Sequence, residues 1–178
     1  MRLAVGQPAA VSDSSPAGAP PGIDAFVAAA PFEGEAREIV HGLKFGRLLG
    51  LAARAAEAMD RAGGELLEGV IVPVPPSPLR WRWRGFDPAE EIALALSRRR
   101  GLPLRRCLYR RHGPRQVGRS RRDRVGDPPD VRLRGSPPGT ALLVDDVCTT
   151  GATLAACASA LRGGGCERVV AVVLARAN

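Results

Sequence analysis

Residues 141–154 read ALLVDDVCTTGATL, an apolar run followed by two carboxylates, a loop of small residues and the start of a second apolar segment. A short apolar run next to turn-forming residues is typical of a buried strand, and the glycine and threonines are typical of a strand-to-helix turn. Carboxylates accept strong hydrogen bonds from sugar hydroxyls, and small residues let backbone N–H groups approach an anion at the positive end of a helix. The order of these parts predicts a sugar-phosphate site.

Two groups of residues in this stretch are candidates for ligand contacts. Asp145 and Asp146 are the candidate partners of ribose hydroxyls. Taken alone, an Asp-Asp pair fits a helix cap or a metal-binding pair equally well. The loop that follows has three threonines around a Gly-Ala step, which exceeds what an ordinary N-cap needs, so phosphate binding is favoured over a capped turn. The loop residues are Thr149, Thr150, Gly151, Ala152 and Thr153.

Predicted strands and helices alternate along the chain. Apolar runs at 69–75, 141–146 and 169–174 predict buried strands, and periodic segments at 87–100 and 152–162 predict helices. The first helix starts with an Asp-Pro-Ala-Glu sequence, in which aspartate can cap and proline is tolerated at the first position. This alternation predicts an α/β fold with a doubly wound, mainly parallel sheet and helices on both faces. Ligands of such sheets bind at the carboxyl ends of the strands.

The chain has 178 residues, which suits one domain with an ordinary core. Residues 1–22 are rich in proline, alanine, serine and glycine, and we expect them to form a flexible N-terminal lead-in to a domain over 23–178. The Ala-rich segment 23–60 has helical spacing and predicts two short helices or one interrupted helix. Residues 105–138 are first basic and then punctuated by glycine and proline, which predicts a basic flexible loop.

Charge, cysteines and hydropathy narrow the class of protein. The net charge is +8 and lysine supplies only one of the 26 basic residues, which indicates either an anionic partner or an arginine-rich genome. The four cysteines form no C-x-x-C pair, so we expect no structural zinc site. No apolar run is long enough for membrane insertion and no signal peptide is visible, so we expect a cytoplasmic protein.

Residues 144–153 resemble the phosphoribosyl pyrophosphate (PRPP) signature of type I phosphoribosyltransferases. From 23 to 178 the chain is similar to one branch, the ComF family of competence-associated phosphoribosyltransferase-like proteins. The flanking motifs follow that family's order along the chain. They are LKF at 43–45, VPVP at 72–75, RGFDPAE at 84–90 and a basic run from Arg111 through Gln116 to Arg124.

The resemblance implies a role for each part of the signature. Asp145 and Asp146 are implied as catalytic residues that hold the ribose hydroxyls, and the loop 149–153 is implied to hold the 5′-phosphate. Mg²⁺ is implied as a cofactor that is held mainly through PRPP itself. Because the chain ends just after its last predicted strand, a hood over the acceptor must come from residues 23–60.

The resemblance also implies contacts outside the signature. Val74, Pro75 and Arg84 are implied at the pyrophosphate, and Arg111 and Gln116 belong to the flexible loop that closes over it. Since X-Pro bonds isomerise at little cost, a cis bond between Val74 and Pro75 is a further hypothesis for the shape of this turn.

Two functions follow from the resemblance. The first is transfer of phosphoribose from PRPP to an unidentified nitrogenous acceptor, with release of pyrophosphate. The second is a PRPP- or nucleotide-binding protein with little or no catalysis, which acts in DNA uptake and contacts single-stranded DNA or competence proteins.

Between Arg98 and Arg124 the chain has twelve arginines, which fit a lid, a nucleic-acid surface or a solvated loop. The sequence also leaves open whether the chain forms a homodimer.

Overall fold

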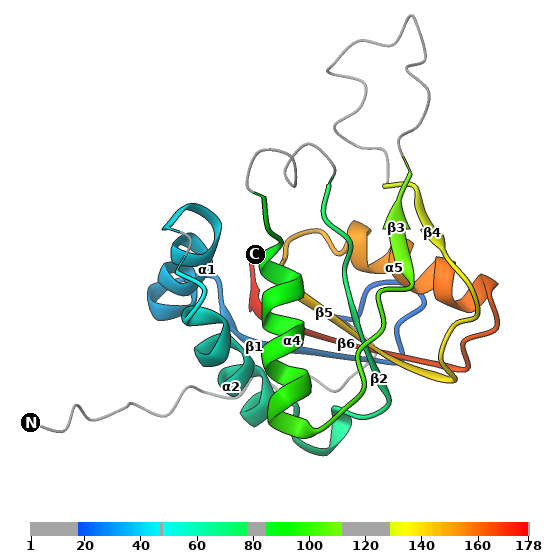
Figure 1. The fold of residues 1–178 in the computed structure, drawn as a ribbon, viewed down its shortest axis with the longest axis horizontal. Coiled ribbons are helices and arrows are strands. Elements are labelled where there is room, and N and C mark those ends of the chain that lie inside the picture. Colours follow the sequence, from blue (N-terminus) through cyan, green and yellow to red (C-terminus); the bar gives the residue numbers. More distant parts are fainter. Residues whose placement is uncertain (1–17, 47, 78–84, 112–128, 178) are drawn as a thin grey trace, which may run out of the picture.

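The computed structural model describes residues 18–46, 48–77, 85–111 and 129–177. A four-stranded parallel sheet lies at its centre, and a two-stranded antiparallel sheet lies beside it (Figure 1). The strands are β1 (Ala25–Pro31), β2 (Val70–Pro73), β3 (Leu108–Arg110), β4 (Val131–Leu133), β5 (Thr140–Cys148) and β6 (Arg168–Arg176). The helices are α1 (Gly34–Gly46), α2 (Leu51–Gly63), α4 (Pro88–Arg100) and α5 (Ala152–Gly163), and a 3-10 turn (Gly64–Leu66) follows α2.

The main sheet has the strand order β1-β6-β5-β2. Its two central strands are nearly continuous apolar runs, because helices cover a parallel sheet on both faces and leave neither face to water. Leu142 and Leu143 of β5 and Val172 and Val173 of β6 are fully buried, although neighbours along a strand point to opposite faces. The predicted doubly wound, parallel α/β fold is confirmed.

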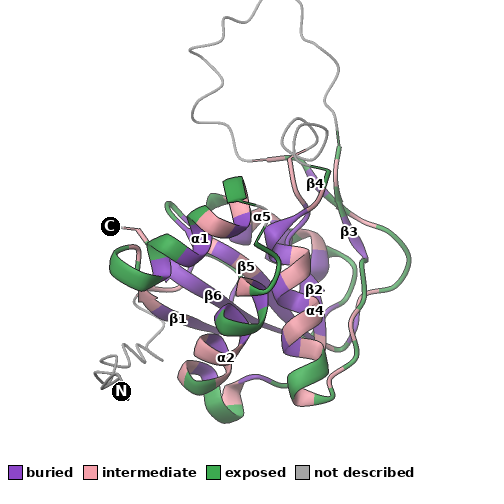
Figure 2. Ribbon diagram, turned by 60° about the vertical axis from the view of Figure 1, so that its left-hand side comes forward, coloured by how far each residue is buried: buried purple, intermediate pink, exposed green. Residues whose placement is uncertain are grey.

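Each face of the sheet has its own core, and burial is concentrated along both (Figure 2). On one face α1, α2 and α4 contribute Leu43, Met59 and Leu96 to a cluster with alternate residues of the strands. On the other face α5 and the β3–β4 pair contribute Leu161 and Val131 to a second cluster. The sheet edge from which ligands are reached lies between these two layers.

Helix α4 begins and ends where the sequence predicts. Asp87 takes the N-cap position, Pro88 lies in the first turn, and Gly101 ends the helix in the left-handed region with a φ of 69°. The N–H group of Gly101 donates to the carbonyl oxygen of Ser97. The Asp87 side chain makes no capping hydrogen bond, however, so its carboxylate is not used in the way the Asp-Pro-Ala-Glu sequence suggests.

The helical prediction for residues 23–60 is wrong for its first part. Residues 25–31 form β1, which pairs in parallel with β6, and the first helix begins only at Gly34. Alanine favours helices in isolation, but this Ala-rich segment can bury Phe26 against one core and Val27 against the other only as a strand. Tertiary contacts therefore override the local propensity.

The flexible-loop prediction for 105–138 is wrong near both of its ends. Leu108–Arg110 and Val131–Leu133 pair as antiparallel strands and bury Leu108 and Val131. Their few apolar residues are hidden in the sequence among many arginines. The middle of the predicted loop, 112–128, lies outside the described residues, as does 1–17 of the predicted lead-in.

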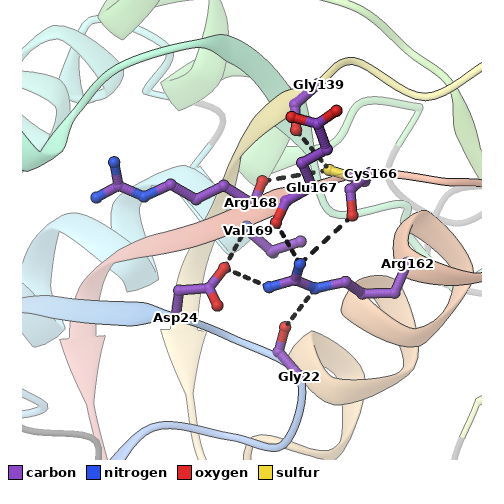
Figure 3. Close-up of polar contacts among 8 residues, drawn as sticks. All are labelled: Gly22, Asp24, Gly139, Arg162, Cys166, Glu167, Arg168 and Val169. Carbon is purple, nitrogen blue, oxygen red and sulfur yellow. Dashed lines mark hydrogen bonds and ion pairs between the residues drawn. The ribbon is translucent and has the colours of Figure 1, made fainter.

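Arg162 near the end of α5 connects three separate segments (Figure 3). Its guanidinium forms an ion pair with Asp24 and donates hydrogen bonds to the carbonyl oxygens of Glu167 and, at longer distances, Gly22 and Cys166. Asp24 also accepts a 2.7 Å hydrogen bond from the Val169 N–H group. Arg162 thus ties α5 to the starts of β1 and β6.

We predict that Arg162→Ala lowers the free energy of unfolding by about 1–3 kcal/mol, because several carbonyl and carboxylate acceptors lose a charged donor together. Urea denaturation followed by far-UV circular dichroism measures this loss. Arg168→Ala is the matched control, since Arg168 forms only an exposed pair with Glu68 and such pairs contribute about 0–1 kcal/mol. Equal losses in the two variants would contradict the role assigned to Arg162.

Candidate functional site

A pocket of about 470 Å³ lies at the carboxyl edge of the main sheet. Its walls come from the end of β5, the turn after β2, the N-terminus of α4 and the first turn of α5. Lys44 of α1 and Arg110 of β3 complete the lining. Segments that are far apart in the sequence therefore meet where ligands of doubly wound folds bind.

Asp145 and Asp146 both line this pocket, although they lie on opposite faces of β5. Pairing between β5 and β2 ends at Val144, so the edge of β5 is open beside both acids. The strand continues to Cys148 without a turn. The two carboxylates meet the same pocket because Asp145 Oδ1 bends back to accept a 2.8 Å hydrogen bond from the Asp146 N–H group.

Lys44 of α1 reaches across the pocket to the acid pair. Its Nζ atom lies 2.6 Å from Asp146 Oδ2, and both side chains are largely buried. The contact is an ion pair without an aligned hydrogen bond, since Asp146 Oδ2 has no hydrogen-bond partner among the described residues. Sequence reasoning noted Lys44 only as part of a motif. The sequence offers one signal that could have singled out Lys44: it is the only lysine in an arginine-rich chain.

The pocket disfavours the ionised form of Asp145. Burial raises the pKa of Asp145 well above its ordinary value, and the neighbouring Asp146 and Asp87 carboxylates raise it further. The Asp146 N–H group and the Lys44 ammonium oppose this rise only in part. The acid cluster therefore retains a proton at pH values where an isolated aspartate has lost it.

The stretch 149–153 joins β5 to α5, and its last two residues, Ala152 and Thr153, begin the helix. Gly151 is the N-cap of α5 and has a φ of 76°, and a Cβ atom there would lie 2.8 Å from Pro20 Cγ. Both facts require glycine. The loop surrounds a hollow of about 40 Å³ at the positive end of α5, and Thr149 and Thr153 also line the larger pocket.

The turn after β2 contributes Val74 and Pro75 to the pocket wall. No peptide bond among the described residues is cis, so the hypothesis of a cis Val74–Pro75 bond is wrong. Arg110 instead fixes this turn: its Nε atom donates a 2.9 Å hydrogen bond to Pro75 O. Its Nη2 atom lies 3.3 Å from Thr153 Oγ1, so Arg110 bridges the turn and the first turn of α5.

Of the remaining predicted site residues, the structure describes Arg111, which does not line the pocket. Arg111 is exposed beyond β3, and its N–H group donates to Asp130 O, whereas the preceding Arg110 faces the site. Sequence reasoning missed Arg110 because neighbouring arginines differ only in the face to which a strand directs them. The implied contacts of Arg84 and Gln116 lie outside the described residues.

The described part of the arginine-rich segment is largely engaged within the protein. Arg99 and Arg100 both pair with Asp60, and Arg106 pairs with Glu90. These contacts explain why Asp60 has a pKa below its ordinary value despite its partial burial. Three of the seven described arginines of this segment are thus paired with two acids, one on α2 and one on α4.

Asp87 is a buried carboxylate of the pocket that sequence reasoning treated only as a helix cap. The residue is 9% exposed, and its Oδ2 atom has no hydrogen-bond partner among the described residues. Burial raises the pKa of Asp87 to about 7, and the charges of Asp146 and Glu90 add to this rise. Backbone N–H groups of Ala89 and Glu90 lower it only in part.

The described residues contain no group of three or more histidine, cysteine or carboxylate side chains that could hold a metal ion. The three aspartates of the pocket do not form such a group. None of the described helices has both the length and the apolar character to span a membrane.

Comparison with known proteins identifies the family. The phosphoribosyl transferase domain model matches residues 84–178, which is more than half of the chain. No curated protein matches the sequence significantly.

Three solved structures illustrate what the chain is similar to. The chain covers between 24% and 80% of the length of these proteins. A purine phosphoribosyltransferase from Pyrococcus horikoshii Ot3 has 18% identity and a TM-score of 0.47, over 69% of this chain and 80% of that one. Orotate phosphoribosyltransferase from Aeropyrum pernix has 26% identity and a TM-score of 0.46, over 74% of this chain and 64% of that one. UMP synthase from Leishmania donovani has 17% identity and a TM-score of 0.42, over 78% of this chain and 24% of that one. On the match of the family model, this chain belongs to the phosphoribosyl transferase domain family.

Proposed function

We propose that this protein binds PRPP and transfers its phosphoribosyl group to a nitrogenous acceptor, with release of pyrophosphate. The observation that carries the proposal is the convergence, in one pocket of about 470 Å³, of the acid pair, the threonine loop and the turn after β2. The family match supports PRPP as the donor.

In this proposal the parts of PRPP are shared among three sets of residues. Asp145 and Asp146 accept hydrogen bonds from the ribose hydroxyls, and Asp146 Oδ2 is available because Lys44 pairs with it without an aligned hydrogen bond. The loop 149–153 presents its N–H groups and hydroxyls to the 5′-phosphate at the positive end of α5. Arg110, next to Pro75, attracts the pyrophosphate.

The transfer itself breaks the bond between C1′ and the pyrophosphate oxygen and forms a bond between C1′ and the acceptor nitrogen. The sugar is positively charged between these events, and carboxylates fixed beside the ribose stabilise that charge. Arg110 and Lys44 favour the negative charge that gathers on the leaving pyrophosphate. Mg²⁺ would arrive with PRPP and shield the charge of its phosphates.

The finer assignment to the ComF branch is also a proposal. It is supported by the collinear motifs, since Lys44 of LKF, Val74 of VPVP and Asp87 of RGFDPAE all line the pocket. A role in DNA uptake with single-stranded DNA as partner is the alternative function. The ion pairs of Arg99, Arg100 and Arg106 count against the described part of the basic segment as the DNA surface.

A panel of purine bases, pyrimidine bases and primary amines tests the transfer. We expect at least one of them to accelerate pyrophosphate release from PRPP in the presence of Mg²⁺, and the variant Asp145→Asn plus Asp146→Asn to abolish that release. This double variant is the control: pyrophosphate release that persists in it would come from a contaminating activity. Tight PRPP binding without acceptor-dependent release across the panel would favour the binding-protein alternative.

A further inference from the structure

One oxygen of the Asp87 carboxylate, Oδ2, lies buried at the pocket wall without a hydrogen-bond donor among the described residues. An N-cap aspartate ordinarily accepts a hydrogen bond from the first turn of its helix. The Asp87 side chain makes no capping bond of regular geometry, and the nearby N–H groups of Ala89 and Glu90 lower its pKa only in part. Its Oδ2 atom is buried and has no hydrogen-bond partner among the described residues. A buried acceptor in this state is costly unless a ligand supplies the missing donor.

We propose that Asp87 is a catalytic residue of the transfer described above: its carboxylate binds the N–H group of the acceptor and takes the proton that the attacking nitrogen loses. The inference rests on the proposed function, because it needs a nitrogen nucleophile and PRPP in the same pocket. It adds an acceptor-side residue to a site whose other described charged groups are assigned to PRPP.

The charges around Asp87 suit a base more than an ion-pair partner. Asp146 and Glu90 carry the same charge as Asp87 and disfavour its ionised form. Lys44 pairs with Asp146, and Arg110 is bonded to backbone and hydroxyl oxygens of the pocket wall. No described cation is paired with Asp87. Among the described residues, the charged groups that line the pocket or adjoin Asp87 are Lys44, Glu90, Arg110, Asp145 and Asp146.

This environment tunes Asp87 for proton transfer near neutral pH. Burial brings its pKa to about 7, close to the value at which a general base combines adequate ionisation with adequate basicity. Of the other two aspartates of the pocket, Asp146 is ion-paired with Lys44, and Asp145 accepts a hydrogen bond from the Asp146 N–H group. Asp87 is therefore better suited than Asp146 to exchange a proton with a neutral ligand.

The proposed step balances as follows. The lone pair of the acceptor nitrogen forms the bond to C1′, the C1′–oxygen bond breaks, and pyrophosphate leaves with its electron pair. The N–H proton of the acceptor passes to Asp87 Oδ2, from which solvent removes it after product release. The acceptor class is a neutral nitrogen heterocycle that carries an N–H group. Phe32 and Phe86 in the pocket lining suit such a flat ring.

The test compares two probes that share one ring: the first must lose a proton to give a neutral product, and the second has a methyl group in place of that proton and gives a cationic product. The compound 1,2,4-triazole is a small N–H heterocycle, and 1-methyl-1,2,4-triazole attacks through a nitrogen that carries no proton. Pyrophosphate release from PRPP with Mg²⁺ is measured for each probe in the wild type, Asp87→Asn, Asp87→Glu and the control Glu91→Gln. Glu91 lies in the first turn of the same helix and does not line the pocket.

We expect Asp87→Asn to lower kcat/KM for triazole by about 10²- to 10⁴-fold and to leave the rate with methyltriazole unchanged. Asp87→Glu should restore part of the triazole rate, and Glu91→Gln should match the wild type. With triazole, kcat/KM of the wild type should rise with pH and level off above about 7, and this rise should vanish in Asp87→Asn.

The failures are distinguishable. A triazole rate that is unchanged in Asp87→Asn, or an equal loss with both probes, overturns the role of Asp87 and leaves the transfer intact. Calorimetry with PRPP and Mg²⁺ completes the test, with the same affinity expected for wild type and Asp87→Asn. If the wild type neither binds PRPP nor releases pyrophosphate with any probe, the proposed function fails and the role of Asp87 fails with it.

Discussion

Replacing both acids of the signature, Asp145→Asn plus Asp146→Asn, is expected to weaken PRPP binding by about 10²- to 10⁴-fold. Each ionised carboxylate that accepts a ribose hydroxyl contributes about 1.5–3 kcal/mol, and two such losses correspond to this range. One opposing effect is smaller: removing negative charge near a polyanion favours binding, but Lys44 already offsets the charge of Asp146 at 2.6 Å.

Isothermal titration calorimetry with three ligands separates these effects. PRPP and ribose 5-phosphate should both bind more weakly to the double variant, whereas inorganic pyrophosphate, which has no ribose, should keep its affinity. Glu35→Gln plus Glu68→Gln is the matched control, because it removes the same charge from two exposed ion pairs away from the pocket. Unchanged PRPP affinity, or an equal loss for pyrophosphate, would rule out the ribose assignment.

The parts of this site that could be predicted from the sequence are those whose signals are local. The apolar run of β5, the two acids and the Thr-Thr-Gly-Ala-Thr loop are contiguous, and each residue type constrains the backbone where it stands. Gly151 shows this most clearly, since its left-handed φ and its contact with Pro20 both exclude a side chain. The start of α4 was predictable for the same reason.

The parts that could not be predicted depend on which elements the fold brings together. Lys44 and Arg110 are separated by 66 residues, and neither belongs to a pattern that indicates contact with the signature. They reach the pocket because α1 and β3 pack at the same edge of the sheet. Strand β1 was missed because its alanines favour a helix locally, and only pairing with β6 decides otherwise.

Asp87 illustrates a different reason, because here the local prediction was correct and still incomplete. The Asp-Pro-Ala-Glu sequence does start α4, with Asp87 at the N-cap position. The direction of its carboxylate is set by burial beside Asp146, which no local pattern reports. A residue that satisfies a structural rule in the sequence can thus serve the site in the fold.

Asp87→Asn is also expected to stabilise the protein above neutral pH. The pKa of this carboxyl is about 7 in the folded state and 3.8 as an ordinary aspartate, so the folded state binds more protons between these values. The free energy of unfolding of the wild type therefore falls as the pH rises from about 4 to about 7, and then levels off. At about 1.4 kcal/mol per pKa unit, Asp87 contributes a fall of as much as about 4 kcal/mol.

Urea denaturation between pH 4 and pH 8 gives the free energy of unfolding of the variant and of the wild type. The difference between the two values isolates Asp87, because the contributions of groups that titrate alike in both proteins cancel. Asp87→Asn should match the wild type near pH 4 and exceed it by as much as about 4 kcal/mol at pH 8, since asparagine cannot ionise. Glu91→Gln should follow the wild type throughout. A difference that does not change with pH would mean that Asp87 titrates as an ordinary surface acid. A difference that grows with pH would mean that stability is sacrificed to keep an unpaired carboxylate in the pocket, which a purely structural cap does not require.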